Sequence, residues 1–343
     1  MTGDEVKAAV FYGKKDVRVE DVDDPSPGPG EVLLRPLYCG ICGTDVDAWN
    51  RGMYAPGVVL GHEVSARVVE CGPEVEGWHP GDMVVANSVI PCGACSFCAE
   101  GKYSLCDNVK MPGITVNGGL AELLTLPADS VLQIPDSIAA REAALTEPLA
   151  VVLHGFSLIR SRWEVGHKAL VTGAGTLGLL AMQVVLAVGS SFVAVSEPNS
   201  ARRGIATKLG ADLVIDPSGS NVWVEFSEKA GRLPDLVVEC SGSPHAAAET
   251  FSLARKGGTV LILGISEEPV EADFMTAVLN ELTFQYSYCG YSEFSTALTL
   301  LEKKMIRVGD LITEIALEDV VEKGFRILTN PQSEVVKLLV KIS

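Results

Sequence analysis

Short hydrophobic runs separated by glycine and proline characterise the first part of the chain. Turn clusters, such as the Pro- and Gly-rich residues 24–30, stand between these runs. The pattern is typical of strands joined by tight turns, and it predicts a mostly-β domain. The expected strands include Lys7–Phe11, Glu31–Pro36, Glu63–Val69 and Met83–Ala86.

From about Glu164 the pattern changes to strands that alternate with helices. Such alternation predicts βαβ units and therefore a parallel sheet. The expected strands are Lys168–Thr172, Phe192–Ser196, Leu213–Asp216, Asp235–Glu239 and Thr259–Gly264, with helices at Leu177–Val188 and Ala201–Leu209. A tail that could return to the first domain follows, with helices at Phe294–Lys304 and Leu317–Leu328 and a strand at Val335–Ile342.

The stretch Ala169–Ser196 carries no charge and is long enough to suggest a membrane span. Four glycines interrupt it, and both of its ends are rich in β-branched residues. A buried strand, a turn, a helix and a second strand explain it better, because strands covered on both faces have continuous apolar sequences. The N-terminus has no basic region followed by an apolar one, so we expect a cytoplasmic protein without a membrane partner.

Charge and cysteine content argue against some classes of partner and of cysteine chemistry. The 343 residues include 27 Lys+Arg and 44 Asp+Glu, for a net charge of −17. That balance argues against nucleic acid, including a zinc-ribbon regulator, because phosphates select basic faces. The nine cysteines are an odd number with four in one short stretch, so a metal site in a reducing compartment is favoured over disulfides.

A glycine-rich turn follows the strand predicted at Lys168–Thr172. Gly173, Gly175 and Gly178 form G-x-G-x-x-G at the start of a predicted helix. There the first glycine permits the turn, the second admits a pyrophosphate, and the third lets the helix pack on the sheet. The alternative is a glycine-rich loop in a nucleotide-free sheet. The candidate cofactor-binding residues of this turn are Gly173, Gly175, Thr176, Leu177 and Gly178.

An acidic residue stands where a dinucleotide's ribose is usually bound. Glu197 ends the next predicted strand, about twenty residues past the turn, where a carboxylate binds the ribose diol. It would repel a 2′-phosphate, so NAD is favoured over NADP. Arg202 and Arg203 leave NADP open, because a nearby arginine can accept that phosphate.

Four cysteines are spaced as metal ligands. Cys92, Cys95, Cys98 and Cys106 follow C-x2-C-x2-C-x7-C, which suits tetrahedral zinc with no open position. A closed site of this kind is structural, because it stabilises a loop that lacks its own core. An iron–sulfur cluster and free thiols are the alternatives.

A second group of metal-ligating residue types lies outside that lobe. Cys39 and Cys42 precede His62 and Glu63 by about twenty residues. Cysteine, histidine and glutamate together offer sulfur, nitrogen and oxygen ligands, which suit zinc with an open position. Glu147 is a further acid just before the apolar second half. A redox C-x-x-C pair and a buried core histidine are the alternatives.

These motifs, in this order, resemble the zinc-dependent medium-chain alcohol dehydrogenase family, in its polyol (sorbitol-type) and threonine dehydrogenase branch. The resemblance covers essentially the whole chain through CGICGTD, GHE, the four-cysteine lobe, EPLA, VTGAGTLG, LGAD and a late strand near Glu281–Gly290. It implies an α/β fold with a GroES-like, mostly-β catalytic domain at residues 1–153 and 291–343. The structural zinc lobe would be residues 91–107, and a Rossmann domain, a doubly wound parallel sheet, would be residues 154–290.

The resemblance also implies roles for individual residues. Cys42, His62 and Glu63 match ligands of a catalytic zinc, and Glu147 matches an acid that binds this metal directly or through its water. Thr44 matches the hydroxyl that takes the substrate proton, and Asp45 a carboxylate that orients the histidine. Cys39 is not a ligand by this match. Two zinc ions per subunit are expected, one catalytic and one structural.

The implied reaction is hydride transfer from a secondary alcohol of a polyol or cyclitol, possibly an aminocyclitol, to NAD, with zinc as Lewis acid. Threonine, 2,3-butanediol and aldose substrates, or a non-catalytic cofactor-binding relative, are the alternatives. Many relatives place a histidine shortly after the G-T/S-D segment, whereas residues 46–49 here contain none. The end of the proton path is therefore unassigned, with Asp47 or water as candidates. The apolar stretch Leu282–Tyr288 matches an edge that pairs subunits, which implies a homodimer or homotetramer.

Overall fold

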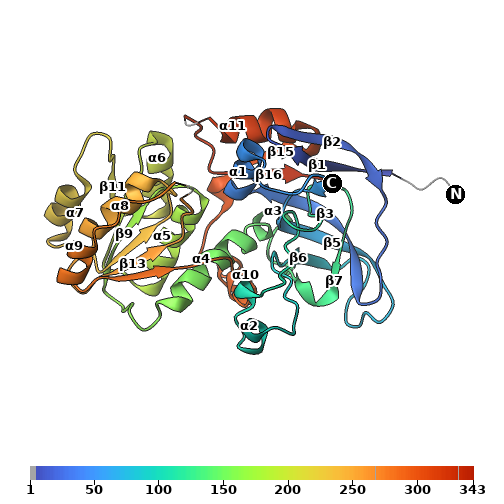
Figure 1. The fold of residues 1–343 in the computed structure, drawn as a ribbon, viewed down its shortest axis with the longest axis horizontal. Coiled ribbons are helices and arrows are strands. Elements are labelled where there is room, and N and C mark those ends of the chain that lie inside the picture. The colour runs from blue at the N-terminus through green and yellow to red at the C-terminus, as the bar shows by residue number, and fades with distance from the viewer. Residues whose placement is uncertain (1–4, 267, 331) are drawn as a thin grey trace. The chain divides into compact units, whose positions relative to one another are not determined.

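The computed structural model describes residues 5–266, 268–330 and 332–343, and its chain divides into two compact units (Figure 1). The first unit comprises Met1–Glu147, Gly290–Glu302 and Ile312–Ser343. The second comprises Pro148–Cys289 and Lys303–Leu311, so the chain enters the second unit twice. Each unit is described separately below.

Two sheets form the first unit. A small antiparallel sheet has the order β2 (Asp16–Asp23), β1 (Glu5–Gly13), β4 (Val58–Val59). The larger sheet has the order β15-β16-β3-β5-β6-β8, and β7 also pairs with β3. Its strands are β3 (Glu31–Ile41), β5 (Glu63–Cys71), β6 (Met83–Ala86), β7 (Leu124–Pro127), β8 (Val131–Gln133), β15 (Ile312–Ala316) and β16 (Lys337–Lys341). Most of these pairs are antiparallel, and β15 with β16 is parallel.

Short helical segments connect these strands. They are α1 (Gly43–Arg51), α2 (Ser96–Ala99), η1 (Tyr103–Leu105), η2 (Ala128–Ser130), α3 (Ala140–Ala143), α10 (Phe294–Glu302), η4 (Leu317–Asp319), η5 (Val320–Phe325) and α11 (Arg326–Leu328). The helix predicted at Leu317–Leu328 is wrong as a single α-helix, because the segment changes from 3₁₀ to π to α. Gly324 explains the close packing there, since a Cβ at that position would lie 2.9 Å from Ile41 Cδ1.

The second unit is built on a six-stranded parallel sheet. Its order is β11 (Leu213–Ile215), β10 (Phe192–Ser196), β9 (Lys168–Thr172), β12 (Leu236–Glu239), β13 (Thr259–Ile262), β14 (Thr283–Tyr286). The central strands are buried almost throughout, as expected when helices cover both faces of a sheet. The strand order reverses between β9 and β12, and ligands typically bind at the carboxyl ends of the strands at such a point.

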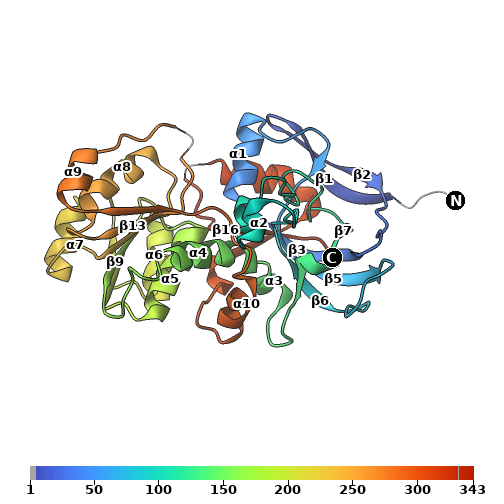
Figure 2. The same ribbon diagram turned by 60° about the horizontal axis from the view of Figure 1, so that its bottom comes forward.

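Helices alternate with these strands, as predicted (Figure 2). They are α5 (Thr176–Val188), α6 (Ser200–Leu209), α7 (Val222–Ala230), α8 (Pro244–Leu253), α9 (Phe274–Leu279) and η3 (Gly309–Leu311), and α4 (Thr146–Leu158) begins in the first unit and continues into the second. The uncharged stretch 169–196 is β9, α5 and β10, which confirms its interpretation as a strand, a turn, a helix and a second strand. Within the described residues, no helix combines the length and apolar character needed to cross a membrane.

Asp235, just before β12, is a buried carboxylate in the second unit that holds several elements together. Its Oδ2 accepts hydrogen bonds from the Lys168 main-chain N–H (2.8 Å) and from Arg232 (2.7 Å). Its Oδ1 accepts from Arg255 Nε (2.5 Å). Burial by itself would raise the pKa of Asp235, but the hydrogen bonds from Arg232, Lys168 and Arg255 lower it to about 2.

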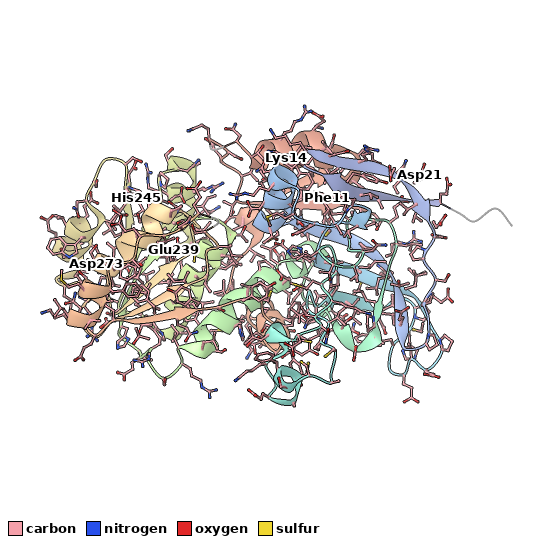
Figure 3. The ribbon with its side chains drawn as sticks, in the orientation of Figure 1. Phe11, Lys14, Asp21, Glu239, His245 and Asp273 are labelled. Carbon is pink, nitrogen blue, oxygen red and sulfur yellow. The ribbon has the colours of Figure 1, made fainter. Side chains whose placement is uncertain are left out.

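We expect Asp235→Asn to lower the stability of the second unit by about 2 kcal/mol, because it leaves two arginines without a partner charge. The folded-state pKa lies below that of an unfolded chain, so this contribution is complete above about pH 4 and is lost as the pH falls toward about 2. Thermal unfolding at several pH values measures it. Asp21→Asn is the control, since Asp21 is exposed with a 3.6 Å ion pair (Figure 3). Equal midpoints for the wild type and Asp235→Asn at pH 7 would contradict the prediction.

Candidate functional site

Antiparallel pairing of β3 with β5 brings the predicted catalytic ligands together in the first unit. Gly40 on β3 pairs with Glu63 on β5, and Cys42 follows the end of β3 as the N-cap of α1. A Cβ on Gly40 would lie 1.9 Å from Glu63 Oε2, so only glycine leaves room for that carboxylate. The thiol of Cys42 therefore meets His62 and Glu63, although about twenty residues separate them in sequence.

Cys42, His62 and Glu63 form a cluster that fits a metal ion. One ligand atom from each lies within 4.8 Å of the others. His62 and Glu63 are buried, with 5% and 1% exposure. Within the described part of the chain, His62 Nδ1 and Glu63 Oε2 have no hydrogen-bond partner. Buried polar atoms are costly without a partner, and a zinc ion bound by sulfur, nitrogen and oxygen would supply one.

Lys337 is a site residue that the sequence analysis did not identify. It lies on β16, is 3% exposed, and its Nζ is 2.6 Å from Glu63 Oε1 and 3.0 Å from the carbonyl oxygen of Ile41. Burial by itself would lower the pKa of Lys337, but Glu63 and Cys42 raise it above its ordinary value. Nothing near Lys337 in sequence indicates this role, because β16 reaches β3 only through tertiary pairing.

A further acid, Asp45, lies beside the cluster. Asp45 is fully buried, and its Oδ2 accepts a hydrogen bond from the Cys42 main-chain N–H (3.0 Å). Its Oδ1 lies 3.8 Å from His62 Nδ1, close enough for charge interaction and too far for a hydrogen bond. Burial raises the pKa of Asp45, and His62 opposes that rise.

Glu147 lies outside the three-residue ligand group. It is buried at the start of α4, and its Oε1 accepts a hydrogen bond from Ser88 Oγ (2.8 Å). Burial raises the pKa of Glu147, while the charge of His62 lowers it and that of Glu63 raises it, so the carboxylate lies near both. Its predicted binding to zinc, directly or through water, stays a prediction.

The four-cysteine lobe brings its sulfur atoms together. The Sγ atoms of Cys92, Cys95, Cys98 and Cys106 all lie within 4.8 Å of one another, and none of the nine cysteines, all of them described, forms a disulfide. The Cys92 main-chain N–H points at Cys106 Sγ (3.2 Å). Hydrogen bonds, first that of the Ala94 main chain, lower the pKa of Cys92 to about 6, which favours the thiolate that binds metal. The set fits tetrahedral zinc.

The dinucleotide turn has the shape that its glycines predict. Gly173 has φ of 90°, and its Cβ would lie 2.9 Å from Ser241 Cα. A Cβ on Gly178 would lie 1.9 Å from the carbonyl oxygen of Gly173, so helix α5 packs against the turn only without one. At Gly175, the N-cap of α5, no described atom lies within 4 Å of an added Cβ. This open position leaves space for a phosphate at the helix N-terminus.

Glu197 lies beside this turn at the end of β10. It is buried, its Oε2 accepts from the Ala174 main-chain N–H (2.6 Å), and its Oε1 accepts from that of Asn199 (2.8 Å). Arg203 is used structurally, since it donates to the carbonyl oxygen of Glu197 and lies 3.0 Å from Asp216. Arg202 lies in the first turn of α6, with its main-chain N–H bonded to Asn199 Oδ1.

Glu239 is a second carboxylate at this sheet edge, and the sequence analysis did not identify it. It ends β12 beside β9 and is buried (Figure 3). Its Oε1 accepts from the main-chain N–H of Ser241 (2.7 Å) and from the hydroxyl of that serine. Ser241 is the residue that faces Gly173, so Glu239 positions the wall of the turn. The signal available in the sequence was the acid at the end of a predicted strand, followed by a serine and a glycine in the run E-C-S-G at residues 239–242.

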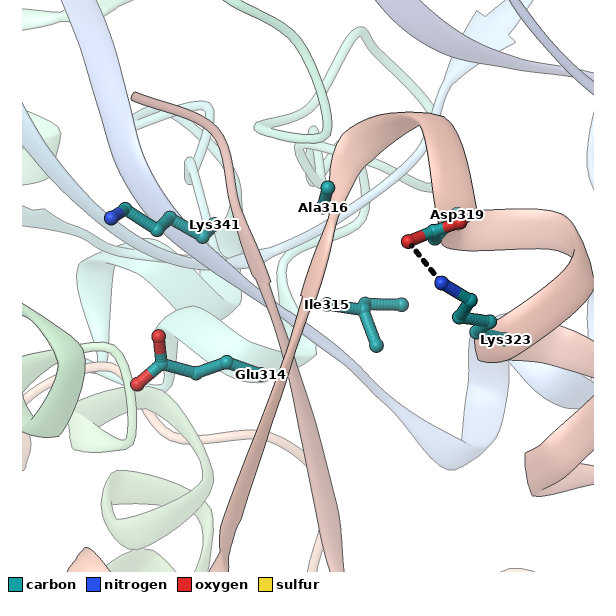
Figure 4. A pocket seen from close by; sticks show the side chains of 6 residues that line it. All are labelled: Glu314, Ile315, Ala316, Asp319, Lys323 and Lys341. Atoms are coloured by element: carbon teal, nitrogen blue, oxygen red, sulfur yellow. Dashed lines mark hydrogen bonds and ion pairs between the residues drawn. The ribbon is translucent and has the colours of Figure 1, made fainter.

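A shallow hollow of about 300 Å³ elsewhere in the first unit contains none of these residues (Figure 4). Lys323 there is paired with Asp319 at 2.9 Å. The lining residues are Glu314, Ile315, Ala316, Asp319, Lys323 and Lys341.

Comparison with protein families assigns both halves of the chain. Residues 28–136 match the alcohol dehydrogenase GroES-like domain, and residues 176–303 match the zinc-binding dehydrogenase domain. The chain belongs to the zinc-dependent medium-chain alcohol dehydrogenase family. It is therefore a dehydrogenase acting on CH–OH donors, and its GroES-like and Rossmann-type fold prediction is confirmed.

Relatives of this dehydrogenase differ in their named substrates. It is 36% identical to the L-threonine 3-dehydrogenase of Pyrococcus furiosus, over 85% of this chain and 86% of that one. It is 31% identical to the sorbitol dehydrogenase of Gallus gallus, over 97% and 96%. A structure described as a zinc-binding dehydrogenase from Sinorhizobium meliloti bound to NADP has a TM-score of 0.91 and 31% identity, covering 98% and 99%.

The two clusters predict separable metal contents. We expect the dehydrogenase to hold two zinc ions per chain, and His62→Ala and Cys98→Ser to hold one each, as measured by elemental analysis with protein quantitation. Cys98→Ser should also lower the unfolding temperature, because the lobe depends on its metal for folding. Cys71→Ser is the control, since this cysteine lies outside both clusters and its thiol contacts the carbonyl oxygen of Trp78. One zinc ion per wild-type chain would contradict the two-site assignment.

Proposed function

We propose that this dehydrogenase oxidises a secondary alcohol of a polyol or cyclitol, aminocyclitols included, with NAD as hydride acceptor. The observation that carries the proposal is the cluster of half-buried Cys42 with buried His62 and Glu63, in which one ligand atom each of His62 and Glu63 has no hydrogen-bond partner among the described residues. The thiol, imidazole and carboxylate would hold the catalytic zinc. When bound, zinc supplies Lewis-acid polarisation of the alcohol oxygen, which lowers the pKa of that alcohol.

The chain's own residues would do the remaining work. Thr44 stands at the start of α1, two residues after Cys42, and its buried Oγ1 has no hydrogen-bond partner among the described residues. It would accept the proton of the substrate hydroxyl. Lys337 holds Glu63 in place by its 2.6 Å ion pair and offsets part of the negative charge. The four cysteines would hold the structural zinc.

Two features support a substrate with several hydroxyls. Carboxylate ligands in place of a second thiolate make the site hydrophilic, and the sorbitol dehydrogenase similarity extends over 97% of the chain. Residues 46–49, just after Thr44, contain no histidine, which disfavours threonine. Threonine oxidation is the second candidate because the relative at 36% identity is named for it. Butanediol and aldose substrates are further alternatives.

Glu197 supports NAD rather than NADP. Its buried carboxylate would repel a 2′-phosphate, and Arg203 is already held by Asp216 and by the carbonyl oxygens of Glu197 and Pro198. A non-catalytic relative is disfavoured because the three clustered ligands and Thr44 are all present.

Initial rates of nicotinamide reduction test this function. With zinc-replete protein, we expect turnover with NAD on at least one of sorbitol, xylitol, galactitol or an inositol. The rate with NADP should be at least about tenfold lower than the rate with NAD. Cys42→Ala should abolish it, and Cys71→Ser should retain it. Turnover of threonine, 2,3-butanediol or glucose alone would overturn the substrate class. Silence with one zinc ion bound would support the non-catalytic alternative.

The exposed edge of the second unit supports assembly into a homodimer or homotetramer. β14 ends the strand order of the parallel sheet, and an edge strand is a template for pairing. The preceding helix α9 exposes a cluster of large apolar side chains, each more than two-thirds exposed: Phe274, Met275, Val278 and Leu279. A patch of this kind on a soluble chain marks an interaction surface.

Light scattering at micromolar concentration should give at least twice the monomer mass. Val278→Glu should shift the protein toward monomer, because it buries a charge in the interface. Val165→Glu is the control, since Val165 is 80% exposed outside α9 and β14. A monomeric wild type would refute the assembly.

A further inference from the structure

The carboxyl ends of three strands meet around one buried acid in the second unit. Glu239 ends β12 and is buried. Just beyond it, the main-chain N–H of Cys240 donates to the carbonyl oxygen of Thr172 at the end of β9 (2.9 Å). On the other side, Gly264 follows β13, and a Cβ there would lie 2.3 Å from Glu239 Oε2. The carboxylate therefore lies against the segment that follows β13, and only glycine at position 264 leaves room for it.

The same carboxylate holds the turn that leads from β12 into α8. Its Oε1 accepts hydrogen bonds from the main-chain N–H of Ser241 (2.7 Å) and from the Ser241 hydroxyl. The oxygen of that hydroxyl accepts from the main-chain N–H of Ser243 (3.1 Å), the N-cap of α8. Gly242 between them has φ of 66°, a conformation that favours glycine. One carboxylate oxygen thus fixes the path of residues 241–243.

Cys240 and Ser241 form one wall of the glycine turn. A Cβ on Gly173 would lie 2.9 Å from Ser241 Cα, and a Cβ on Gly178 would lie 3.5 Å from Cys240 Cβ. The turn and this wall therefore pack closely because two side chains are absent. The wall lies on the β12 side of β9, whereas Glu197 follows β10 on the opposite side of β9.

This arrangement assigns one half of a dinucleotide to each side of β9. A dinucleotide crosses a parallel sheet where the strand order reverses, with its pyrophosphate at the helix N-terminus beside the glycine turn. Glu197, which would bind the adenosine ribose, lies on the β10 side. The nicotinamide half would then extend over the carboxyl ends of β12 and β13. These are the two strand ends that Glu239 contacts.

We propose that Glu239 is a positioning residue for the nicotinamide half of the cofactor. It does not bind the cofactor itself, because it is buried and its Oε1 is bonded to Ser241. It acts by fixing Ser241 and the segment after β13 as a preformed surface, so that cofactor binding does not have to order them. The inference rests on the proposed use of NAD by this dehydrogenase.

Equilibrium binding to the zinc-replete dehydrogenase, without an alcohol, tests this role. AMP carries the adenosine half alone and NAD carries both halves, so calorimetric titration with each separates the two. We expect Glu239→Gln to raise the Kd of NAD about tenfold, because a charged acceptor of two hydrogen bonds is lost. The Kd of AMP should change by less than about twofold. Ser241→Ala, which removes the hydroxyl alone, should raise the Kd of NAD about threefold.

A buried carboxylate at the opposite end of β12 provides the matched control. Asp235→Asn should lower the unfolding temperature and leave both Kd values within about twofold of the wild type, because Asp235 bonds to Arg232, Arg255 and Lys168 and not to the turn. The double variant of Glu239→Gln and Ser241→Ala should bind NAD no more weakly than Glu239→Gln alone, since both changes remove the same hydrogen bond.

Three results would count against the inference in different ways. Unchanged NAD binding in Glu239→Gln, or equal rises in the Kd of AMP and NAD, would overturn the role of Glu239 while leaving the proposed function intact. If the wild type binds NADP more tightly than NAD, the titrations use NADP and 2′,5′-ADP, so a wrong cofactor choice is a separate result. A wild type that binds neither dinucleotide would overturn the proposed function and this inference together.

Discussion

Buried negative charge around Cys42 and His62 is the constraint on which the first unit depends. Glu63, Asp45 and Glu147 are all at least nine-tenths buried, beside the Cys42 thiol, which would bind a metal as the thiolate. Burying carboxylates costs several kcal/mol each unless a cation or hydrogen bonds compensate them. Among the described residues, Lys337 supplies a buried cation there, and Ser88 and the Cys42 main chain donate hydrogen bonds. The remaining imbalance is what a divalent ion would neutralise.

This constraint explains why the chain returns to its first unit. Lys337 reaches Glu63 because β16 pairs antiparallel with β3, with Leu338 opposite Ile41. Strand β16, which lies between β15 and β3, thus brings a compensating charge to the site from nearly three hundred residues along the chain. Gly40 meets the same need by steric means, since any side chain there would displace the carboxylate.

The second unit compensates its buried carboxylates in a different way. Glu197 and Glu239 accept hydrogen bonds from main-chain N–H groups at the carboxyl ends of parallel strands. Asp235, at the opposite ends, accepts hydrogen bonds from two arginine side chains. The first two acids shape the glycine turn, and the third joins β9, β12 and the segment before β13. Buried carboxylates therefore shape the candidate binding turn at one end of the sheet and stabilise the sheet at the other.

Sequence alone determined the features that depend on neighbours along the chain. The strands of the parallel sheet follow from continuous apolar runs, the glycine turn from its spacing, and the four-cysteine cluster from short loops that hold the thiols near one another. Tertiary structure decided the rest. Helix α1 was missed because its sequence is mostly polar, and capping by Asp45 and packing of Trp49 on Phe325 stabilise it. Lys337 and the mixed helix at residues 317–328 depend on contacts between distant segments, because burial and charge compensation exist only once the chain has folded.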